Sequence, residues 1–528
     1  MADLALGIAG LAVGIPGLVQ VTLSIGDAIR KRLVHYEDDF KRLLDIVIRI
    51  NKSQSQDMLL YFFGEEDQPV PRELQDELVE MFQVLRGIFE RLLLMFPDAE
   101  GPGKKTAVSA ALKARAEETI EALEEWNDRF FKRALVFVMF GRRKLPKTVD
   151  EDLGDDGYGV VALRKVERLR DTVYESLEGA KKGTRLLLSQ PEAADDSRTP
   201  LRDSSLQVGT RNSTNEAFLV EYRTYSDDAR EWEIQNHRRV VRDMAAILHH
   251  ADARLMGILH CEGFLWDSVS NRFELRFPFP PGLAKPRTLL DLLRDPENRR
   301  SGVRHALNQR VALARRIVKA VFVLHAAGFV HKQIRPDNVV IFDRIIPPPG
   351  GHAESSAAAV ARSRYPYVLG EPFLVGFDNV RKVDAASLML SVEDWQKSIY
   401  LSPERHRLQQ GDEFQMRHDI FSLGVVLLEV AFWASFQDRA SPQLGKRVWK
   451  DGGATLRSPG ELKSVYLALA AGAVPRLMGQ KYADAVTACL TGLESEGRGA
   501  KDLEDDDGIV VGTKYVTAII RKLEEISI

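Results

Sequence analysis

The sequence begins with an apolar run, residues 4–26, in which no side chain carries a charge. As a single α-helix, these 23 residues would be about 35 Å long, which is enough to cross the hydrocarbon core of a bilayer. Asp3 stands where a secretory signal needs a basic region, so the run is not interpreted as a signal peptide. Such a run forms either a helix buried in a helical domain or a helix that enters a membrane.

Glycine residues in this run keep both interpretations open. Gly10 and Gly14 are four positions apart, which is the small-residue spacing that lets helix backbones approach closely in lipid. Small residues also fit a tight helix crossing inside a protein core. Pro16 and the glycines give a lower helix propensity than a permanent membrane anchor would have.

Residues 30–190 show apolar side chains at the three- and four-residue steps of amphipathic helices. We expect helices at about residues 36–50, 73–96 and 106–140, with a further helix at 158–188. Together with the apolar run, they predict an all-α bundle of four helices at residues 1–150. A brace helix at residues 151–190 would close the bundle.

The end of the third of these helices is strongly basic. Residues 129–147 contain seven Lys or Arg residues and no acidic residue, around an apolar run. Aromatic rings between cations suit contact with anionic lipid headgroups. A helix end that complements its own dipole would show the same pattern. The candidate lipid contacts are Arg129, Lys132, Arg133, Arg142, Arg143 and Lys144.

A second domain follows a stretch rich in Ser, Asp, Pro and Thr at residues 191–214, which predicts a flexible linker. Residues 215–528 change from short alternating runs to helical patterns, which indicates an α+β domain. The net charge of −3 argues against a nucleic-acid partner. Two cysteines are too few for a disulfide scaffold, and no standard metal-ligand spacing occurs, so we expect an intracellular protein without a metal site.

Four motifs in the second domain resemble those of the protein kinase family. HKQIRPDN at residues 331–338 resembles the catalytic loop, and LVGFD at 374–378 stands at the place of the metal-binding motif. LSPE at 401–404 resembles the end of an activation segment, and DIFSLG at 419–424 resembles the start of a buried helix. Their order implies a bilobal, protein-kinase-like domain over residues 215–528.

The catalytic positions of that family are altered here. The position of the general base is Gln333, whose neutral amide cannot accept the proton of a substrate hydroxyl. The metal-ligand position is Gly376, with Asp378 two residues later. Residues 183–284 contain no lysine, and the strand expected to carry the phosphate-binding lysine offers Glu221 or Arg223. We expect a pseudokinase that requires no cofactor, and leave ATP binding open.

The residues that match the protein kinase motifs have two kinds of expected role. Asn338 and Arg223 are the candidate ATP contacts, and Arg335 also remains in the loop. Hydrogen bonding and packing are the expected roles of His331, Pro403, Glu404 and Asp419. In the activation segment, hydroxyls that would accept phosphate from an upstream kinase belong to Ser387, Ser391, Ser398 and Tyr400.

The opening GIAGLAVGIPGLV resembles the start of fungal HeLo and HeLo-like domains, which are cell-death modules. A helical bundle and brace followed by a pseudokinase resembles the mixed lineage kinase domain-like family of necroptosis executioners. The resemblance implies that the bundle permeabilises membranes after its release and oligomerisation. The inserting residues would then include Leu4, Gly10, Gly14, Leu18 and Ile25.

That resemblance also implies partners and location. The partners would be membranes with anionic phospholipids, further copies of the chain, and an upstream kinase or sensor protein. The chain would be cytoplasmic at rest and move to the plasma membrane on activation. Two alternatives stay open: a signalling scaffold or adaptor with a pseudokinase domain, and an atypical active Ser/Thr kinase that uses Asp378 and Asn338 to hold metal.

Overall fold

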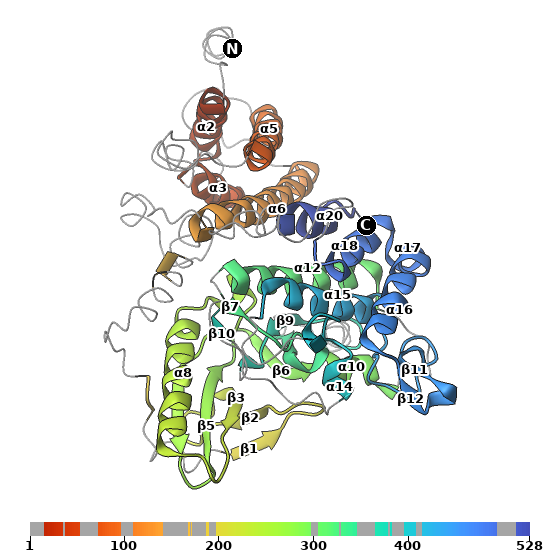
Figure 1. Ribbon diagram of the computed structural model, residues 1–528. Helices are drawn as coiled ribbons and strands as arrows, with labels where there is room; N and C mark the ends of the chain where they lie inside the picture. The colour runs from red at the N-terminus through yellow and green to blue at the C-terminus, as the bar shows by residue number, and fades with distance from the viewer. Residues whose placement is uncertain are drawn as a thin grey trace, which may run out of the picture. The chain divides into compact units, whose positions relative to one another are not determined.

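The computed structural model divides into two compact units, Met1–Arg168 and Leu169–Ile528, each described here by itself (Figure 1). The boundary falls inside the predicted brace. The structure describes residues 15–34, 37–52, 72–96, 109–140, 167–168, 171, 186–188, 197–296, 305–326, 329–345, 365–377, 381–382, 395–407, 414–493 and 514–527.

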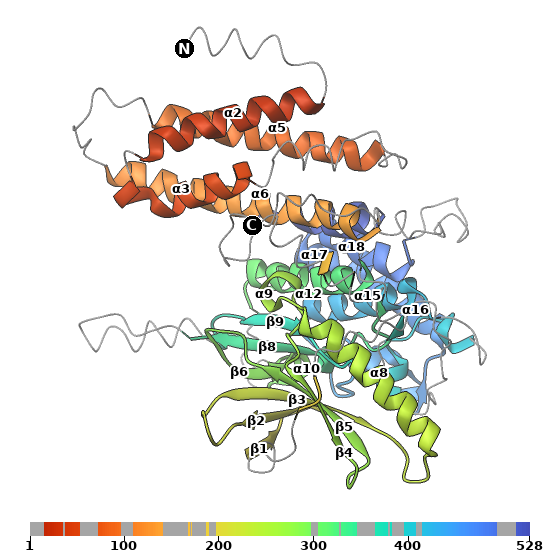
Figure 2. The same ribbon diagram turned by 90° about the vertical axis from the view of Figure 1, so that its left-hand side faces the viewer.

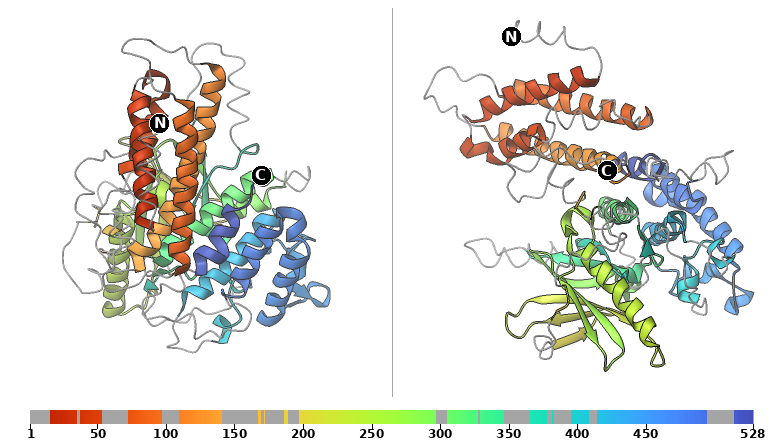
Figure 3. Two further views of the ribbon diagram at one scale, coloured as in Figure 1. Left: turned by 90° about the horizontal axis from the view of Figure 1, so that it is seen from above. Right: turned by 60° about the vertical axis from the view of Figure 1, so that its left-hand side comes forward.

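Nearly all described residues of the first unit are helical. Its longer helices are α2 (Ile15–Leu33), α3 (Glu37–Lys52), α5 (Arg72–Met95) and α6 (Ala110–Phe140). Helix α2 packs on α3 and α5, and α6 packs on the same two helices (Figure 3). The helices predicted from apolar periodicity at residues 36–50, 73–96 and 106–140 are thus confirmed, with ends shifted by a few residues.

Aromatic side chains of α5 and α6 form the centre of this packing. The ring of Phe82 lies 6.1 Å from the ring of Trp126 and 5.9 Å from that of Phe130, measured between centroids. The indole nitrogen of Trp126 donates to the backbone oxygen of Met81 at 2.7 Å, so the buried indole keeps a partner. Large aromatic side chains bury much apolar surface, and this contact therefore holds the two helices together.

The second unit begins with a five-stranded antiparallel sheet in the order β1-β2-β3-β5-β4 (Figure 2). Helix α8 (Glu231–His249) lies between β3 and β4 in the chain and packs against β4 and β5. The strands are β1 (Ser197–Pro200), β2 (Gln207–Thr210), β3 (Ala217–Thr224), β4 (Gly263–Asp267) and β5 (Arg272–Pro278).

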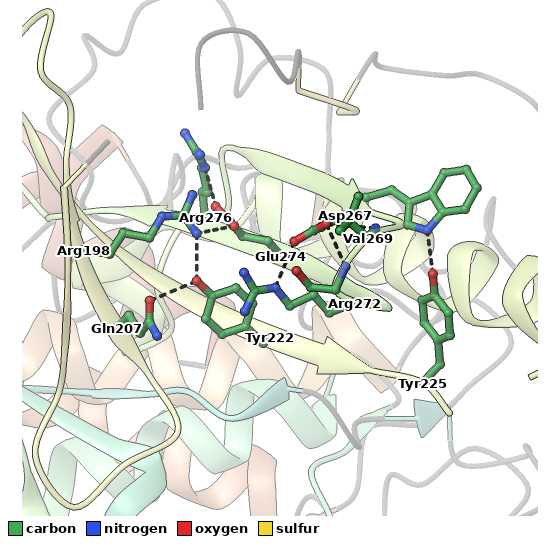
Figure 4. A network of polar contacts seen from close by, with 11 residues as sticks. Arg198, Gln207, Tyr222, Tyr225, Asp267, Val269, Arg272, Glu274 and Arg276 are labelled. Carbon is green, nitrogen blue, oxygen red and sulfur yellow. Dashed lines mark hydrogen bonds and ion pairs between the residues drawn. The ribbon is translucent and has the colours of Figure 1, made fainter. Parts of the chain in front are cut away.

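A flexible linker was predicted at residues 191–214. This prediction is wrong for β1 and β2, which lie within that stretch. The polar composition of this stretch suits an edge strand, because β1 is mostly exposed. Polar contacts hold it to the sheet: Arg198 donates to the hydroxyl of Tyr222 at 2.7 Å and pairs with Glu274 at 2.5 Å (Figure 4). Tyr222 in turn donates to Gln207 of β2 at 3.0 Å. Cross-strand polar pairs therefore stabilise strands that lack apolar side chains.

The rest of the second unit is mainly helical around α15 (Met416–Phe432), which is almost wholly buried. A three-stranded sheet of order β6-β8-β9 also belongs to this part, and two helices lie between β6 and β8 in the chain. The further elements are α9 (Ala253–Met256), β6 (Leu283–Thr288), α10 (Leu289–Arg294), α12 (Leu307–Ala326), β7 (Phe329–Val330), η3 (Pro336–Asn338), β8 (Val339–Arg344), β9 (Glu371–Leu374), β10 (Arg381–Lys382), α14 (Trp395–Ser398), η5 (Arg405–Arg407), η6 (Gly445–Val448), β11 (Trp449–Lys450), η7 (Asp451–Gly453), β12 (Thr455–Leu456), α16 (Pro459–Gly472), α17 (Val474–Met478), α18 (Gln480–Leu490), η9 (Val516–Ile520) and α20 (Arg521–Glu524). Helices and antiparallel sheets together make this unit α+β, as predicted.

The prediction of a brace helix is wrong at the C-terminal end of that helix. Residues 186–188 form an isolated parallel bridge between Leu187 and Phe264 of β4. Pairing with a sheet edge replaces the helix there, because the backbone hydrogen bonds go to β4. Apart from Glu167, Arg168 and Asp171, which are helical, the remainder of residues 151–185 lies outside the described residues.

Candidate functional site

The buried carboxylate of Asp419 shapes the loop at residues 331–338. Asp419 lies in the first turn of α15 and accepts hydrogen bonds from the backbone nitrogens of His331, at 2.5 Å, and Lys332, at 2.8 Å. The Nε2 atom of His325 lies 3.1 Å from the same carboxylate. Several donors on one buried carboxylate offset the cost of its burial and fix the backbone of the loop.

His331 connects this loop to the segment after β9. Its Nε2 atom lies 2.8 Å from the backbone oxygen of Val375, and its Nδ1 atom lies 3.3 Å from the backbone nitrogen of Gln333. Burial lowers the pKa of His331 to about 4, so the ring is neutral near pH 7. Nε2 is then the donor and Nδ1 the acceptor. The roles predicted for His331 and Asp419, hydrogen bonding and packing, agree with these contacts.

Asn338 and Gly376 occupy the centre of the site and contact each other closely. Asn338 donates through Nδ2 to the backbone oxygen of Gln333 at 2.8 Å. Gly376 has a φ of +86°, and a Cβ built there would lie 2.3 Å from Cγ of Asn338. A side chain at position 376, including an aspartate, therefore requires Asn338 or the backbone to move.

Glu221 of β3 reaches the same point from the sheet. Its Oε2 atom accepts a hydrogen bond from the backbone nitrogen of Gly376 at 3.1 Å, and the side chain is 2% exposed. Arg223, two residues along β3, instead donates through Nε to Nδ1 of His237 in α8, at 3.2 Å. Of the two residues that the sequence offered, Glu221 is the one at the site. The predicted ATP contact of Arg223 therefore lacks support, because its guanidinium is directed to α8.

Gln333 and Arg335 interact with each other within the loop. Arg335 donates to Oε1 of Gln333 at 3.0 Å and pairs with Asp337 at 2.9 Å. An amide that accepts from a guanidinium offers no basic atom for proton transfer. Asp378 lies outside the described residues. Among the residues that the structure describes, no group of three or more His, Cys, Asp or Glu side chains is arranged to hold a metal ion.

A second buried polar cluster was not predicted from the sequence. Oε1 of Glu429 accepts from the hydroxyls of Tyr400 and Ser435, at 2.9 and 3.0 Å, and from the backbone nitrogen of Phe436, at 2.7 Å. Burial raises the pKa of Glu429 to about 8. The signal that would have found it is a lone acidic residue in an otherwise apolar run of α15.

This cluster also bears on the predicted phosphate acceptors. The hydroxyl of Tyr400 is committed to Glu429, and both Tyr400 and Ser398 are buried. Neither is accessible to a kinase in this conformation, so the prediction fails for these two residues. Ser387 and Ser391 lie outside the described residues. Glu404, for which hydrogen bonding and packing were predicted, is half-exposed beside Pro403, and its Oε2 atom lies 3.5 Å from Nε of Arg417.

The predicted inserting residues are only partly described. Leu4, Gly10 and Gly14 lie outside the described residues. Leu18 is half-buried in α2 and Ile25 is buried, as are Val19 and Val21. Within the described parts of the chain, no helix combines the length and the apolar character that crossing a membrane requires.

Two of the predicted lipid contacts are buried in the first unit. Lys132 is 4% exposed and pairs with Asp128 at 2.6 Å, and Arg133 is 5% exposed and pairs with Glu77 of α5 at 3.2 Å. In this conformation both charges are paired with acidic side chains, and their contact with lipid after activation stays a prediction. Arg129 pairs with Glu125 on the helix surface at 2.8 Å. Arg142, Arg143 and Lys144 lie outside the described residues.

No protein-family model matches this sequence, and a search of curated proteins finds no match either.

Proposed function

We propose that this chain is a regulated cell-death effector. Its first, helical unit would permeabilise membranes, and its second unit would be a catalytically deficient, kinase-like regulator. The kinase-like assignment is supported by the order of elements in the second unit. A five-stranded antiparallel sheet, with helices α8 and α9 between its third and fourth strands in the chain, precedes a helical part in which a buried aspartate holds a loop. Fold analogy alone does not assign activity, so the deficiency is argued from the residues of the site.

The observation that carries the deficiency is the contact between Glu221 and Gly376. Phosphoryl transfer needs a base for the substrate hydroxyl, a carboxylate for the metal and a cation for the phosphates. The corresponding positions hold Gln333, Gly376 and Glu221. A carboxyl group at the third position cannot supply the positive charge that a phosphate requires. We therefore assign the site a structural and regulatory role, with no cofactor required.

Burial of α2 supports a membrane-active first unit that is held inactive. The charge-free residues 15–26 include Val19, Val21 and Ile25, and these side chains are covered by neighbouring helices. Release of α2 would expose a stretch without charges to an anionic membrane. An upstream kinase or sensor protein acting on the second unit would shift the equilibrium from the state in which α2 is buried to the state in which it is released. Further copies of the chain would then assemble. The chain would thus be cytoplasmic at rest and act at the plasma membrane.

The test is dye release from vesicles that contain anionic phospholipid, with the first unit (residues 1–168) as the added protein. We expect release that falls strongly in Leu18→Lys, because a charge in α2 opposes insertion. Gln20→Lys should also lower release, and since Gln20 is exposed on the same helix, this variant adds the charge without disturbing the packing of α2. Absence of release at every lipid composition, or equal release by Leu18→Lys, would contradict the proposal.

A signalling scaffold is the second candidate, and one observation favours it. Lys132 and Arg133, which the membrane interpretation assigned to lipid, are buried and paired inside the unit. A scaffold would leave anionic vesicles intact and would form a stable complex of fixed stoichiometry with a protein partner. Co-purification of such a partner together with the absence of dye release would replace the first proposal by the second.

A further inference from the structure

Two tryptophans and an arginine meet on the second unit, and these three residues, Trp395, Arg439 and Trp449, are here called the Arg–Trp surface. Trp395 belongs to α14 and Trp449 to β11, and their rings lie edge to face with centroids 5.1 Å apart. The guanidinium carbon of Arg439 lies 3.8 Å from the ring centroid of Trp449 and 5.8 Å from that of Trp395. Three separate segments of the chain thus form one aromatic and cationic surface.

The Arg–Trp surface is open to solvent. Arg439 is exposed, and Trp395 and Trp449 are each half-exposed. Indole rings bury much apolar area when they pack, and tryptophan with arginine is the combination enriched at the energetic centres of protein interfaces. Two indoles that stay half-exposed therefore leave contact area for a partner to cover.

Arg439 is held in place without being neutralised. It donates through Nη2 to the backbone oxygen of Gly453 at 3.1 Å, and it forms no ion pair with any residue in the described parts of the chain. A guanidinium carries five N–H donors in a rigid plane, which matches the two oxygens of a carboxylate. The stack on Trp449 and the bond to Gly453 thus preorganise Arg439 to bind a carboxylate.

The chain around this surface carries an excess of positive charge. Residues 438–461 contain five Lys or Arg residues and three Asp or Glu residues, whereas the whole chain has a net charge of −3. One of the acids, Glu461, is already paired with Lys450 at 3.3 Å. Lys446 and Arg447, just before β11, are exposed. Local positive charge on a chain that is negative overall favours an acidic partner at this place.

Two features favour a peptide over a membrane or a nucleic acid. Trp232, elsewhere in this unit, is 63% exposed, but no large apolar side chain is exposed in residues 395–398 or 437–461, which the structure describes in full. A bilayer would therefore find no projecting apolar side chain to take up. Arg439 lies over one face of Trp449 and covers a ring face on which a nucleotide base would stack.

We propose that the Arg–Trp surface binds an acidic peptide segment of a partner protein. A carboxylate of the peptide would pair with Arg439, and a neighbouring apolar side chain would lie against the two indoles. The inference goes beyond the proposed function, which needs a partner on the second unit but gives it no surface. Peptide binding is measured in solution and membrane permeabilisation by dye release, so either can fail while the other holds.

The test is selection from a display library of short random peptides on the immobilised full chain. Peptides that also bind Arg439→Gln are removed first, so that ligands of other surfaces are discarded. We expect the recovered sequences to share an acidic residue next to an aromatic or aliphatic one. Replacement of that acidic residue by its amide in a synthetic peptide should weaken binding by at least about tenfold, as the loss of a residue at the centre of an interface does.

Matched variants separate the planar guanidinium from positive charge alone. Arg439→Lys keeps the charge but lacks the planar donors, so the peptide should bind this variant about as weakly as it binds Arg439→Gln. Lys446→Ala removes an exposed cation outside the stack, and the loss of affinity should stay below about threefold, as for an exposed charge. Because Arg439 and Lys446 are both exposed, we expect these variants to keep the melting temperature of the native chain.

The proposal is overturned if no peptide that depends on Arg439 is recovered, or if the recovered peptides lack acidic residues. It is also overturned if Arg439→Lys and Lys446→Ala weaken binding equally, because charge alone would then explain the affinity. Anionic vesicles or a single-stranded oligonucleotide serve as competitors. If either displaces the peptide at a lower concentration than the unlabelled peptide does, the surface belongs to a membrane or to a nucleic acid instead.

Discussion

The carboxyl group of Glu221 accepts a hydrogen bond from the backbone nitrogen of Gly376 at 3.1 Å. The two residues are 155 positions apart in the chain, and the contact joins the five-stranded sheet to the segment that follows β9. Gly376 also lies against Asn338, so sheet, loop and segment meet at one buried point. Glu221, Asn338 and Gly376 thus join three separate parts of the second unit.

The first prediction concerns nucleotide binding. We expect no rise in the melting temperature of the full chain on addition of ATP and Mg²⁺, because Glu221 places a carboxyl group where a phosphate needs a cation, and Gly376 has no side chain to hold a metal. Differential scanning fluorimetry over a range of ATP concentrations measures this. A rise that increases with ATP and is lost in Asn338→Ala would support the active-kinase alternative instead.

The second prediction concerns the hydrogen bond itself. Glu221→Gln keeps an acceptor for the nitrogen of Gly376 and should change the free energy of unfolding little. Glu221→Ala leaves that buried nitrogen without this acceptor and should lose about 1–3 kcal/mol. Urea unfolding of both variants is the measurement. Equal losses in the two variants would mean that the charge, and not the hydrogen bond, is what matters at this position.

The third prediction concerns the close contact at Gly376. Gly376→Ala combines an unfavourable positive φ with overlap against Asn338, and we expect a loss of about 2–5 kcal/mol in unfolding free energy. Gly452→Ala is the matched control: it has a φ of +67° but open space around its Cβ, so only about 1–2 kcal/mol should be lost. In a double-mutant cycle, Asn338→Ala should recover part of the loss at 376. Equal losses at 376 and 452 would show that the overlap is unimportant.

The fourth prediction concerns pH. Burial raises the pKa of Glu429 from its ordinary value of 4.5 to about 8, so the folded state binds a proton that the unfolded state releases. This contribution to stability is complete below about pH 4.5 and is lost as pH rises through 8, with a slope of up to about 1.4 kcal/mol per pH unit in between. Unfolding free energies measured from pH 5 to 8 should therefore fall more steeply in the native chain than in Glu429→Gln. Identical slopes would contradict the assignment.

The fifth prediction separates structure from lipid contact in α6. Arg133→Ala breaks the buried pair with Glu77 and should lower the unfolding free energy by about 3–5 kcal/mol. Arg129→Ala removes a surface pair and should lose less than about 0.5 kcal/mol. If Arg133→Ala instead weakened vesicle binding with no loss of stability, the lipid interpretation would return.

Local patterns predicted the parts of the fold that local physics decides. Apolar periodicity predicted α3, α5 and α6, because the spacing of a helix face depends only on neighbouring residues. Strands β1 and β2 were missed, because they depend on contacts such as Arg198 with Glu274, which is 76 positions away. Glu221 was a candidate from its place in a lysine-free region, but its partner Gly376 followed only from the fold. The buried cluster at Glu429 has no motif, and its one signal is a lone acidic residue in an apolar run of α15.

The central claim is that the second unit restrains a membrane-active first unit. The most direct measurement compares dye release from anionic vesicles by residues 1–168 and by the full chain at equal concentration. The account predicts that the first unit alone releases dye at concentrations at which the full chain leaves the vesicles intact. Equal release by the two proteins would contradict the restraint, and absence of release by both would contradict the membrane function itself.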